Sequence, residues 1–304
     1  MKQLAIIGPT ASGKSDLAIS IAQKNNAYIL SIDSLSIYKE IDIVSAKPSQ
    51  SELSSVKHFG INEIYPNAYF SVDIFIKLYK NILQKCKEDK KNLVIVGGTS
   101  FYLKSLMQGL SPLPKITHTT QELVKEKLLD LEEYHSFLTS IDPKHMAKIN
   151  KNDSYRIEKA ALIYEASQLT PSQWFAENPP QVIANDLSIF NIDVERDILR
   201  KRISKRTNKM LELGLIDEVC YLEQKYTRLP NAMKSIGIVE VLDFLDAKID
   251  KDVMLEQIST HTAQLAKRQQ TFNKTQFQKV YNAKLEDLED LIEKNMFSGA
   301  QRGI

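Results

Sequence analysis

Cysteines are scarce in this sequence: Cys86 and Cys220 are the only two in 304 residues. Because they lie far apart in the chain, they supply neither a disulfide framework nor a cluster of thiolate metal ligands. Free cysteine is among the most buried residue types. We therefore expect two buried thiols in a protein of a reducing compartment, with the cytoplasm as its location.

Long apolar runs are also lacking. A membrane-spanning helix needs about 20 consecutive apolar residues, whereas the apolar segment at the start of the chain, residues 4–7, ends at Gly8. That segment is also too short for a secretory signal peptide. With 43 % hydrophobic and 26 % charged residues, the composition is that of a globular protein of about two domains. We expect a monomer without a membrane partner.

The net charge of +2 is too small to indicate a partner, but two segments are locally basic. Residues 193–210 contain seven Lys or Arg against three Asp or Glu, and residues 264–279 contain four against none. Such segments suit a polyanion such as a nucleic acid. A run of charge is equally typical of the solvated face of a helix, so composition leaves both interpretations open.

The first third of the chain alternates strand-like and helix-like patterns. Apolar runs at residues 4–8, 27–33 and 92–98 are separated by residues 17–22 and 72–83, where apolar side chains recur at helical spacing. Strands that alternate with helices predict a buried parallel sheet with helical crossovers. The expected fold class is therefore α/β.

The pattern becomes helical and polar in a stretch that begins near SPLPK and ends near ENPPQ. A strand-like run at residues 187–193 then predicts a return to the sheet, followed by helices and a frayed tail at residues 298–304. We expect a core of residues 1–112 and 186–304 that is interrupted by a helical insertion of residues 113–185.

The most specific motif is GPTASGKS, which fits the P-loop pattern G-x-x-x-x-G-K-[ST] between a predicted strand and a predicted helix. Its glycines let backbone amides turn inward around an anion, and the N-terminus of the helix adds positive potential. Lysine reaches the outer phosphate in such a loop, and the final serine binds Mg²⁺. The predicted phosphate-binding residues are Gly8, Pro9, Thr10, Ala11, Ser12, Gly13, Lys14 and Ser15.

The P-loop does not reveal which phosphate compound is bound. The strand at residues 93–96 is followed by GGT, whereas many P-loop NTPases place an Mg²⁺-binding aspartate after a strand. An ATPase is therefore less favoured, although a P-loop small-molecule kinase or NTPase stays the main alternative. A protein that binds RNA without turnover is a third hypothesis, because of the basic segments.

Two polar residues follow predicted strands at the edge where open parallel sheets bind ligands. Asp33, with Ser34 and Ser36 behind it, is placed to act as a general base, or else to cap a turn or helix. Thr99 follows a glycine pair that lets a substrate approach the backbone. Its hydroxyl either enters the same crevice or caps the helix that begins near Phe101.

The basic segment at residues 193–210 predicts a helix with a paired cationic face. Arg202 and Arg206 are four residues apart and share a face, while Leu199, Ile203 and Met210 form an apolar stripe. Two guanidinium groups on one face suit a diphosphate. Surface ion pairs with nearby acidic residues are the alternative.

A series of motifs along nearly the whole chain resembles the tRNA dimethylallyltransferases, which prenylate the adenosine 3′ of the anticodon. The motifs, in chain order, are GPTASGKS, SIDSLSIYKEIDIVSAKP, KHFGI, FSVDIF, IVGGTSFYLKSLMQGLSPLP, NDSYRIEKA, DVERDILRKRISKRTNKMLELGLIDEV, KSIGIVE and QLAKRQQTF. The resemblance implies a P-loop NTPase-like core with an inserted helical tRNA-binding domain.

The resemblance also implies a reaction. Dimethylallyl diphosphate would bind the P-loop with Mg²⁺, Arg202 and Arg206, and the exocyclic amine of a flipped-out adenine would attack its allylic carbon. Asp33 would accept the proton of the amine, Thr99 would orient the reactants, and Arg206 would neutralise the leaving diphosphate. Residues implied to contact tRNA are Asp33, Ser34, Leu35, Ser36, Thr99, Arg156 and Lys159.

Overall fold

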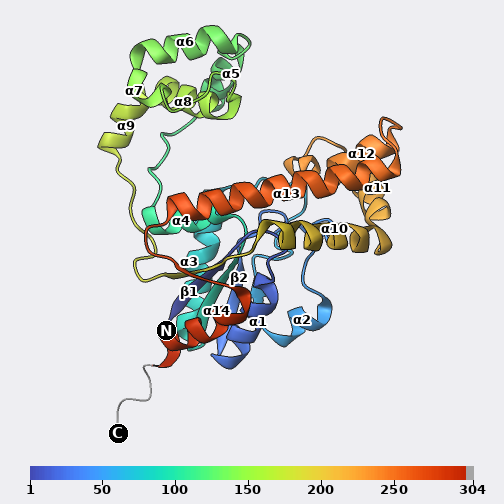
Figure 1. The fold of residues 1–304 in the computed structure, drawn as a ribbon. Helices are drawn as coiled ribbons and strands as arrows, with labels where there is room; N and C mark the ends of the chain where they lie inside the picture. Colours follow the sequence, from blue (N-terminus) through green and yellow to red (C-terminus); the bar gives the residue numbers. More distant parts are fainter. Residues whose placement is uncertain (299–304) are drawn as a thin grey trace. The chain divides into compact units, whose positions relative to one another are not determined.

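A computed structural model describes residues 1–298 of the chain (Figure 1). The fold is α/β, as predicted, and divides into two compact units. The first unit contains Met1–Leu106 and the chain from Ala184 onward, and the second is Met107–Ile183. The insertion expected at residues 113–185 overlaps the second unit over most of its length.

The first unit is built on a six-stranded sheet in the order β3-β2-β4-β1-β5-β6, and its neighbouring strands run parallel. The carboxyl ends of β1, β2 and β4 therefore meet at one edge, where Gly8, Asp33 and Gly98 follow them. The strands are β1 (Gln3–Ile7), β2 (Ala27–Ser31), β3 (His58–Phe59), β4 (Asn92–Gly97), β5 (Ser188–Ile192) and β6 (Tyr281–Ala283).

Helices connect these strands and form the rest of the first unit, in which α4 begins. They are α1 (Lys14–Lys24), α2 (Gln50–Ser55), α3 (Val72–Glu88), α4 (Ser100–Gln108), α10 (Arg196–Glu212), α11 (Leu215–Tyr226), α12 (Ile238–Leu245), α13 (Lys251–Gln276) and α14 (Leu285–Ile292), with short turns of 3₁₀-helix at Asn231–Lys234 and π-helix at Glu293–Phe297.

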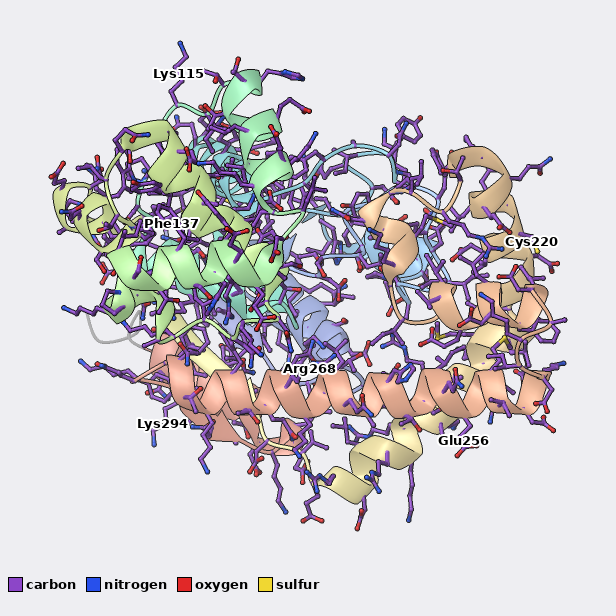
Figure 2. All side chains as sticks on the ribbon, turned by 90° about the horizontal axis from the view of Figure 1, so that it is seen from above. Lys115, Phe137, Cys220, Glu256, Arg268 and Lys294 are labelled. Atoms are coloured by element: carbon purple, nitrogen blue, oxygen red, sulfur yellow. The ribbon has the colours of Figure 1, made fainter. Side chains whose placement is uncertain are left out.

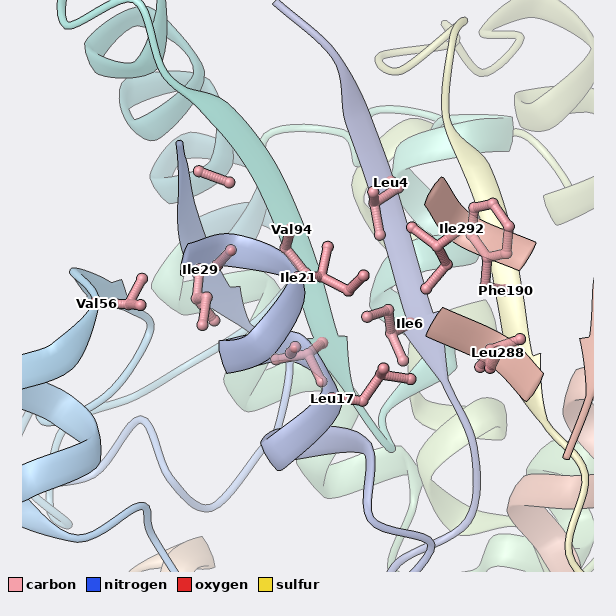
Figure 3. Packing of buried hydrophobic residues seen from close by; sticks show 14 of the residues in the cluster. Leu4, Ile6, Leu17, Ile21, Ile29, Val56, Val94, Phe190, Leu288 and Ile292 are labelled. Carbon is pink, nitrogen blue, oxygen red and sulfur yellow. The ribbon is translucent and has the colours of Figure 1, made fainter. Parts of the chain in front are cut away.

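Alternate residues of β1 face opposite sides of the sheet. On one face Leu4 and Ile6 pack against buried leucine and isoleucine side chains of α1 and α14 (Figure 3). On the other face the Tyr79 hydroxyl of α3 donates to Gln3 Oε1 at 2.6 Å. Each fully buried aliphatic side chain contributes about 1.5–3 kcal/mol, so both layers hold the edge of the sheet in place.

A second apolar cluster joins the segment after Asp33 to the C-terminal helices. Ile37, Ile41 and Val44 are buried in it beside residues of α11, α12 and α13. Three successive backbone amides of the same segment, from Asp42 to Val44, donate to the Glu218 carboxylate of α11 at 2.8–2.9 Å. The segment that carries Asp33 is therefore anchored at its far end.

The second unit is helical and has a core of its own. Val124, Leu138, Met146, Ile157 and Leu162 are buried in that core. The helices are α5 (His118–Lys127), α6 (Leu131–Ile141), α7 (Pro143–Met146), α8 (Ser154–Ser167) and α9 (Pro171–Glu177).

Some expectations need correction. The sequence patterns did not predict the short strands β3 and β6, and β6 interrupts a region that was expected to be helical. Cys86 is buried as predicted, but the same prediction for Cys220 is wrong because its side chain is exposed on α11. The apolar stripe of α11 runs through Val219 and Leu222 and leaves Cys220 outside it.

Within the described residues, no helix is long and apolar enough to cross a membrane. The frayed tail expected at residues 298–304 lies, apart from Ser298, outside the described residues.

Candidate active site

The P-loop turns between β1 and α1, as its sequence predicts. Ala11 has φ of 62° and Gly13 has φ of 91°, both in the left-handed region. A Cβ at Gly13 would also lie 2.6 Å from Leu285 Cδ2 of α14, so both conformation and space require glycine there. The loop therefore reaches the N-terminus of α1, where unpaired backbone amides and the helix dipole favour an anion, in a curved path.

Lys14 is partly buried beside this loop, and its Nζ donates to Pro9 O at 3.1 Å. Burial lowers the pKa of Lys14 to about 8; Asp33 acts in the opposite direction, and the positive charge of Arg206 lowers the pKa further. A desolvated ammonium group gains more from an incoming anion than an exposed one does. Lys14 is thus a strong candidate for binding phosphate.

Helix α10 brings two guanidinium groups to the P-loop. Arg206 Nη1 donates to Thr10 Oγ1 at 3.2 Å, and Arg202 Nη1 donates to Ser12 O at 3.3 Å. Burial lowers the pKa of Arg206, and Asp33 raises it. The predicted shared face is confirmed: both arginines donate to the P-loop, and among residues 1–298 neither forms the surface ion pair that was the alternative.

Asp33 follows β2 and organises the turn after it. Its Oδ1 accepts from Leu35 N at 2.9 Å and from Ser36 N at 3.2 Å, which is an Asx-type turn. The turn therefore uses one carboxylate oxygen. The side chain also lines the cavity that contains Lys14 and Arg206, so its role in the turn is compatible with a role in the cavity, which stays a prediction.

Thr99 connects the ends of two strands. Its Oγ1 accepts from Ser34 N at 3.2 Å, which leaves the hydroxyl proton to be donated elsewhere. Two strand ends come close here because Gly97 has no side chain: a Cβ there would lie 2.8 Å from Ile32 Cγ1 and 3.0 Å from Asp33 N. The Thr99 hydroxyl oxygen thus binds the loop after β2, while the backbone carbonyl of Thr99 accepts from Tyr102 N at 3.0 Å in the first turn of α4.

These groups surround a cavity of about 500 Å³ in the first unit. One part of its lining, the polar end, consists of Lys14, Asp33, Thr99 and Arg206, and the rest mixes apolar side chains with polar ones such as Lys234 and Arg268. The apolar lining residues are Leu35, Val44, Phe101, Ile203, Met210, Ile236, Ile258, Leu265 and Phe272. A site with converging cations, one carboxylate and an apolar wall is suited to a substrate that joins an anionic group to a hydrocarbon.

A smaller adjoining cavity of about 70 Å³ contains Ser15, Asp33, Lys14 and Arg206. Hydroxyl and carboxylate oxygens are the donors that Mg²⁺ prefers, and Mg²⁺ usually keeps several waters and binds substrate phosphates. Within residues 1–298 no three His, Cys, Asp or Glu side chains are grouped to hold a metal by themselves. The Ser15 hydroxyl nevertheless fits a cation that takes its remaining ligands from a diphosphate and water.

The remaining predicted residues have different surroundings. Ser34 is exposed, whereas Ser36 is only 5 % exposed and lines the smaller cavity. Arg156 and Lys159 lie on α8 in the second unit. Arg156 Nε lies 3.5 Å from Asp153 Oδ2, and Lys159 Nζ lies 5.2 Å from the centre of the Tyr155 ring.

Helix α13 contributes a cavity wall to which the sequence analysis assigned no site residue. Thr262, Leu265, Arg268, Gln269 and Phe272 line the cavity at helical spacing. Figure 2 shows this long helix from above, with Arg268 labelled. The available signal was the motif QLAKRQQTF, which indicated a family but no role for its members.

The sequence matches a known family over most of its length. The model of the family described as IPP transferase matches residues 36–276. A tRNA dimethylallyltransferase of Sulfurimonas denitrificans is 66 % identical over 292 residues, which are 96 % of this chain and 98 % of that protein. The tRNA dimethylallyltransferase of Helicobacter pylori is 38 % identical over 98 % of this chain and 95 % of its own length.

Solved structures agree. The crystal structure of a tRNA delta(2)-isopentenylpyrophosphate transferase from Staphylococcus epidermidis is 30 % identical, with a TM-score of 0.69 over 97 % of this chain and 98 % of that chain. A eukaryotic dimethylallyltransferase acting on tRNA has a TM-score of 0.81 over 97 % of this chain and 76 % of that chain. Its 24 % identity supports the fold alone.

Proposed function

The chain belongs to the tRNA dimethylallyltransferase family, and from this we propose that its cavity transfers a dimethylallyl group from dimethylallyl diphosphate to the adenosine 3′ of the anticodon in tRNA. The exocyclic nitrogen of adenine forms a bond to the allylic carbon, the bond from that carbon to diphosphate oxygen breaks, and the nitrogen loses a proton. The observation that carries the proposal is one cavity lined by a carboxylate and by two partly buried cations, Lys14 and Arg206.

The donor binds at the P-loop end of the cavity. Backbone amides of the loop surround the diphosphate, and Lys14, Arg202 and Arg206 balance its charge. Ser15 would hold Mg²⁺, which would supply further neutralisation of the leaving group. Stabilising charge on a departing diphosphate is worth about 2.7–4 kcal/mol for each well-placed donor. The residues in this role are Gly8, Pro9, Thr10, Ala11, Ser12, Gly13, Lys14, Ser15 and Arg202.

Asp33 accepts the proton of the amine, and Thr99 positions the reactants. The turn bonds at Oδ1 hold the carboxylate in one orientation, which leaves Oδ2 for the amine. General-base catalysis contributes about 10²- to 10⁴-fold. The rest of the acceleration comes from holding a weak aryl amine against the allylic carbon.

The acceptor base reaches the cavity after leaving its stack in the anticodon loop. The turn beside Asp33 contacts the nucleotide and consists of Ser34, Leu35 and Ser36. The chief role of Ser36 is to hold this turn in position. Arg156 and Lys159 of the second unit bind phosphates of the anticodon stem-loop.

A small-molecule kinase is not favoured. The family and its relatives are transferases of prenyl groups to tRNA, and β4 is followed by Gly98 and Thr99 instead of an aspartate.

The test is to incubate the protein with Mg²⁺, dimethylallyl diphosphate and unmodified tRNA, and to weigh the digested nucleosides by mass spectrometry. Prenylated adenosine is the expected product. Hydrolysis of ATP or transfer of its phosphate in a parallel sample, without prenylated adenosine, would support the kinase instead.

A further inference from the structure

Helix α13 carries amide side chains that bind the loops at the carboxyl edge of the sheet. Asn273 is buried, and its Oδ1 accepts from Ser100 Oγ at 2.6 Å. Gln270 Nε2 donates to Val194 O at 3.1 Å. Gln269 is the third such amide residue of α13. Unlike Asn273 and Gln270, it lines the cavity and binds the P-loop.

Gln269 Oε1 accepts from the backbone amide of Thr10 at 2.8 Å. The hydroxyl of the same threonine accepts from Arg206 at 3.2 Å. Thr10 is therefore fixed from two helices, through its main chain by α13 and through its side chain by α10. Both contacts lie at the polar end of the cavity, next to Lys14.

Gly98 makes room for this contact. A Cβ at Gly98 would lie 2.3 Å from Gln269 Nε2 and 3.1 Å from its Cδ. Gly98 does not have a left-handed φ, so an alanine would meet no backbone strain there. Space for the carboxamide, and not conformation, is the reason for glycine at this position.

The amide is also the right chemical group for its place. An acceptor is needed for the Thr10 amide, which excludes lysine and arginine. A carboxylate would accept equally well but would add a negative charge beside a bound diphosphate. Glutamine supplies the acceptor without that charge.

We propose that Gln269 is a positioning residue, which holds Thr10 so that the P-loop keeps the shape that binds the donor's diphosphate. The identity of that diphosphate rests on the proposed function. The contact fixes the loop before substrate arrives, so its loss weakens donor binding more than it weakens tRNA binding.

Titration with inorganic diphosphate and Mg²⁺, followed by calorimetry, tests the proposal directly. Gln269→Ala is expected to weaken binding about 3- to 10-fold, the usual value of one hydrogen bond. Gln269→Glu, which has the same size, is expected to weaken it further. Gln270→Ala, one residue along the same helix, is the matched control and leaves diphosphate affinity unchanged. Unchanged or tighter binding by Gln269→Ala would overturn the proposal, the latter by showing that the carboxamide competes with diphosphate.

A second route reaches the same contact without removing Gln269. Gly98→Ala displaces the carboxamide and is expected to weaken diphosphate binding as much as Gln269→Ala does. In the double variant the added methyl group has no carboxamide to displace, so Gly98→Ala then causes no further loss. Additive losses would contradict the proposed contact.

Steady-state kinetics separate this proposal from the proposed function. Gln269→Ala should raise KM for dimethylallyl diphosphate while KM for tRNA stays the same. If the wild-type protein prenylates tRNA and the variant has an unchanged donor KM, the role of Gln269 is refuted and the function stands. If diphosphate binding depends on Gln269 but no prenylated product forms, the role stands and the function is refuted.

Discussion

Lys14 combines a positive charge with a partly buried position, which has a cost for the free protein and a benefit for anion binding. Burial lowers its pKa to about 8 from an ordinary value of 10.5. The ammonium form is therefore present at neutral pH but is lost under mildly alkaline conditions.

For catalysis, we predict that kcat/KM for the donor falls as pH rises through about 8, because the free protein then loses the Lys14 charge. The corresponding limb for kcat should lie at higher pH, since a bound diphosphate favours the charged form. The check is a pH profile of both parameters at saturating tRNA. Limbs at the same pH for both would contradict the role of Lys14 in donor binding.

For stability, the unfolded chain holds more protons than the folded chain between pH 8 and 10.5, so the Lys14 contribution to stability rises with pH across this window. Lys14→Met should therefore stabilise the free protein at pH 7, by up to about 3 kcal/mol. The gain should shrink by pH 10. Urea unfolding at both pH values checks this, and a gain that is independent of pH would refute the charge as its cause.

At the residue scale, the sequence singled out four residues that the structure brings together in one cavity: Lys14, Asp33, Thr99 and Arg206. Each follows a recognisable motif or a strand end. Gln269 was beyond prediction because its contact joins residues that are 259 positions apart, and nothing local in a helical glutamine indicates that partner.

At the element scale, α14 stabilises the site although it lies near the end of the chain. Leu288 is fully buried against the β1 face that also carries α1, and Leu285 lies under Gly13. The P-loop therefore packs against a helix that lies more than 250 residues away in the sequence.

We predict that Leu288→Ala destabilises the protein by about 2–5 kcal/mol, because it opens a cavity in this layer. Leu229→Ala is the control: Leu229 is 83 % exposed, so its truncation should cost less than about 0.5 kcal/mol. Thermal or urea unfolding measures both. Equal stabilities of the two variants would refute the supporting role of α14.

The predictability of elements follows their length. The long periodic patterns of α1, α3 and α10 and the apolar runs of β1, β2, β4 and β5 were sufficient to predict them. Strands β3 and β6 have two and three residues, and each lies at an edge of the sheet. Strands this short form because they pair with a neighbouring strand. Two or three residues are too few to show the alternation of apolar and polar side chains that would predict a strand.

At the scale of the whole molecule, we expect the binding of the two substrates to depend differently on ionic strength. In the proposed function the donor binds the partly buried Lys14 and Arg206, whereas tRNA binds exposed cations such as Arg156. Screening acts mainly on exposed charges, so KM for tRNA should rise steeply with ionic strength and KM for the donor much less.

We predict that Arg156→Ala and Lys159→Ala each weaken tRNA binding and reduce the slope of log affinity against log salt by about 0.7–0.9. Lys125→Ala, at an exposed lysine of the same unit, is the control and leaves the slope unchanged. Filter binding across a salt series measures this. Equal slopes for all variants would remove α8 from the proposed tRNA contact.

The central claim is that Asp33 takes the proton of the amine, and Asp33→Asn tests it most directly because the amide keeps an Oδ1 acceptor for the turn. The measurement is the single-turnover rate of prenyl transfer at saturating donor and tRNA. We predict a fall of about 10²- to 10⁴-fold, with the affinities for tRNA and inorganic diphosphate within about twofold of wild type. A wild-type rate for Asp33→Asn would contradict the account, because the proton would then have another acceptor.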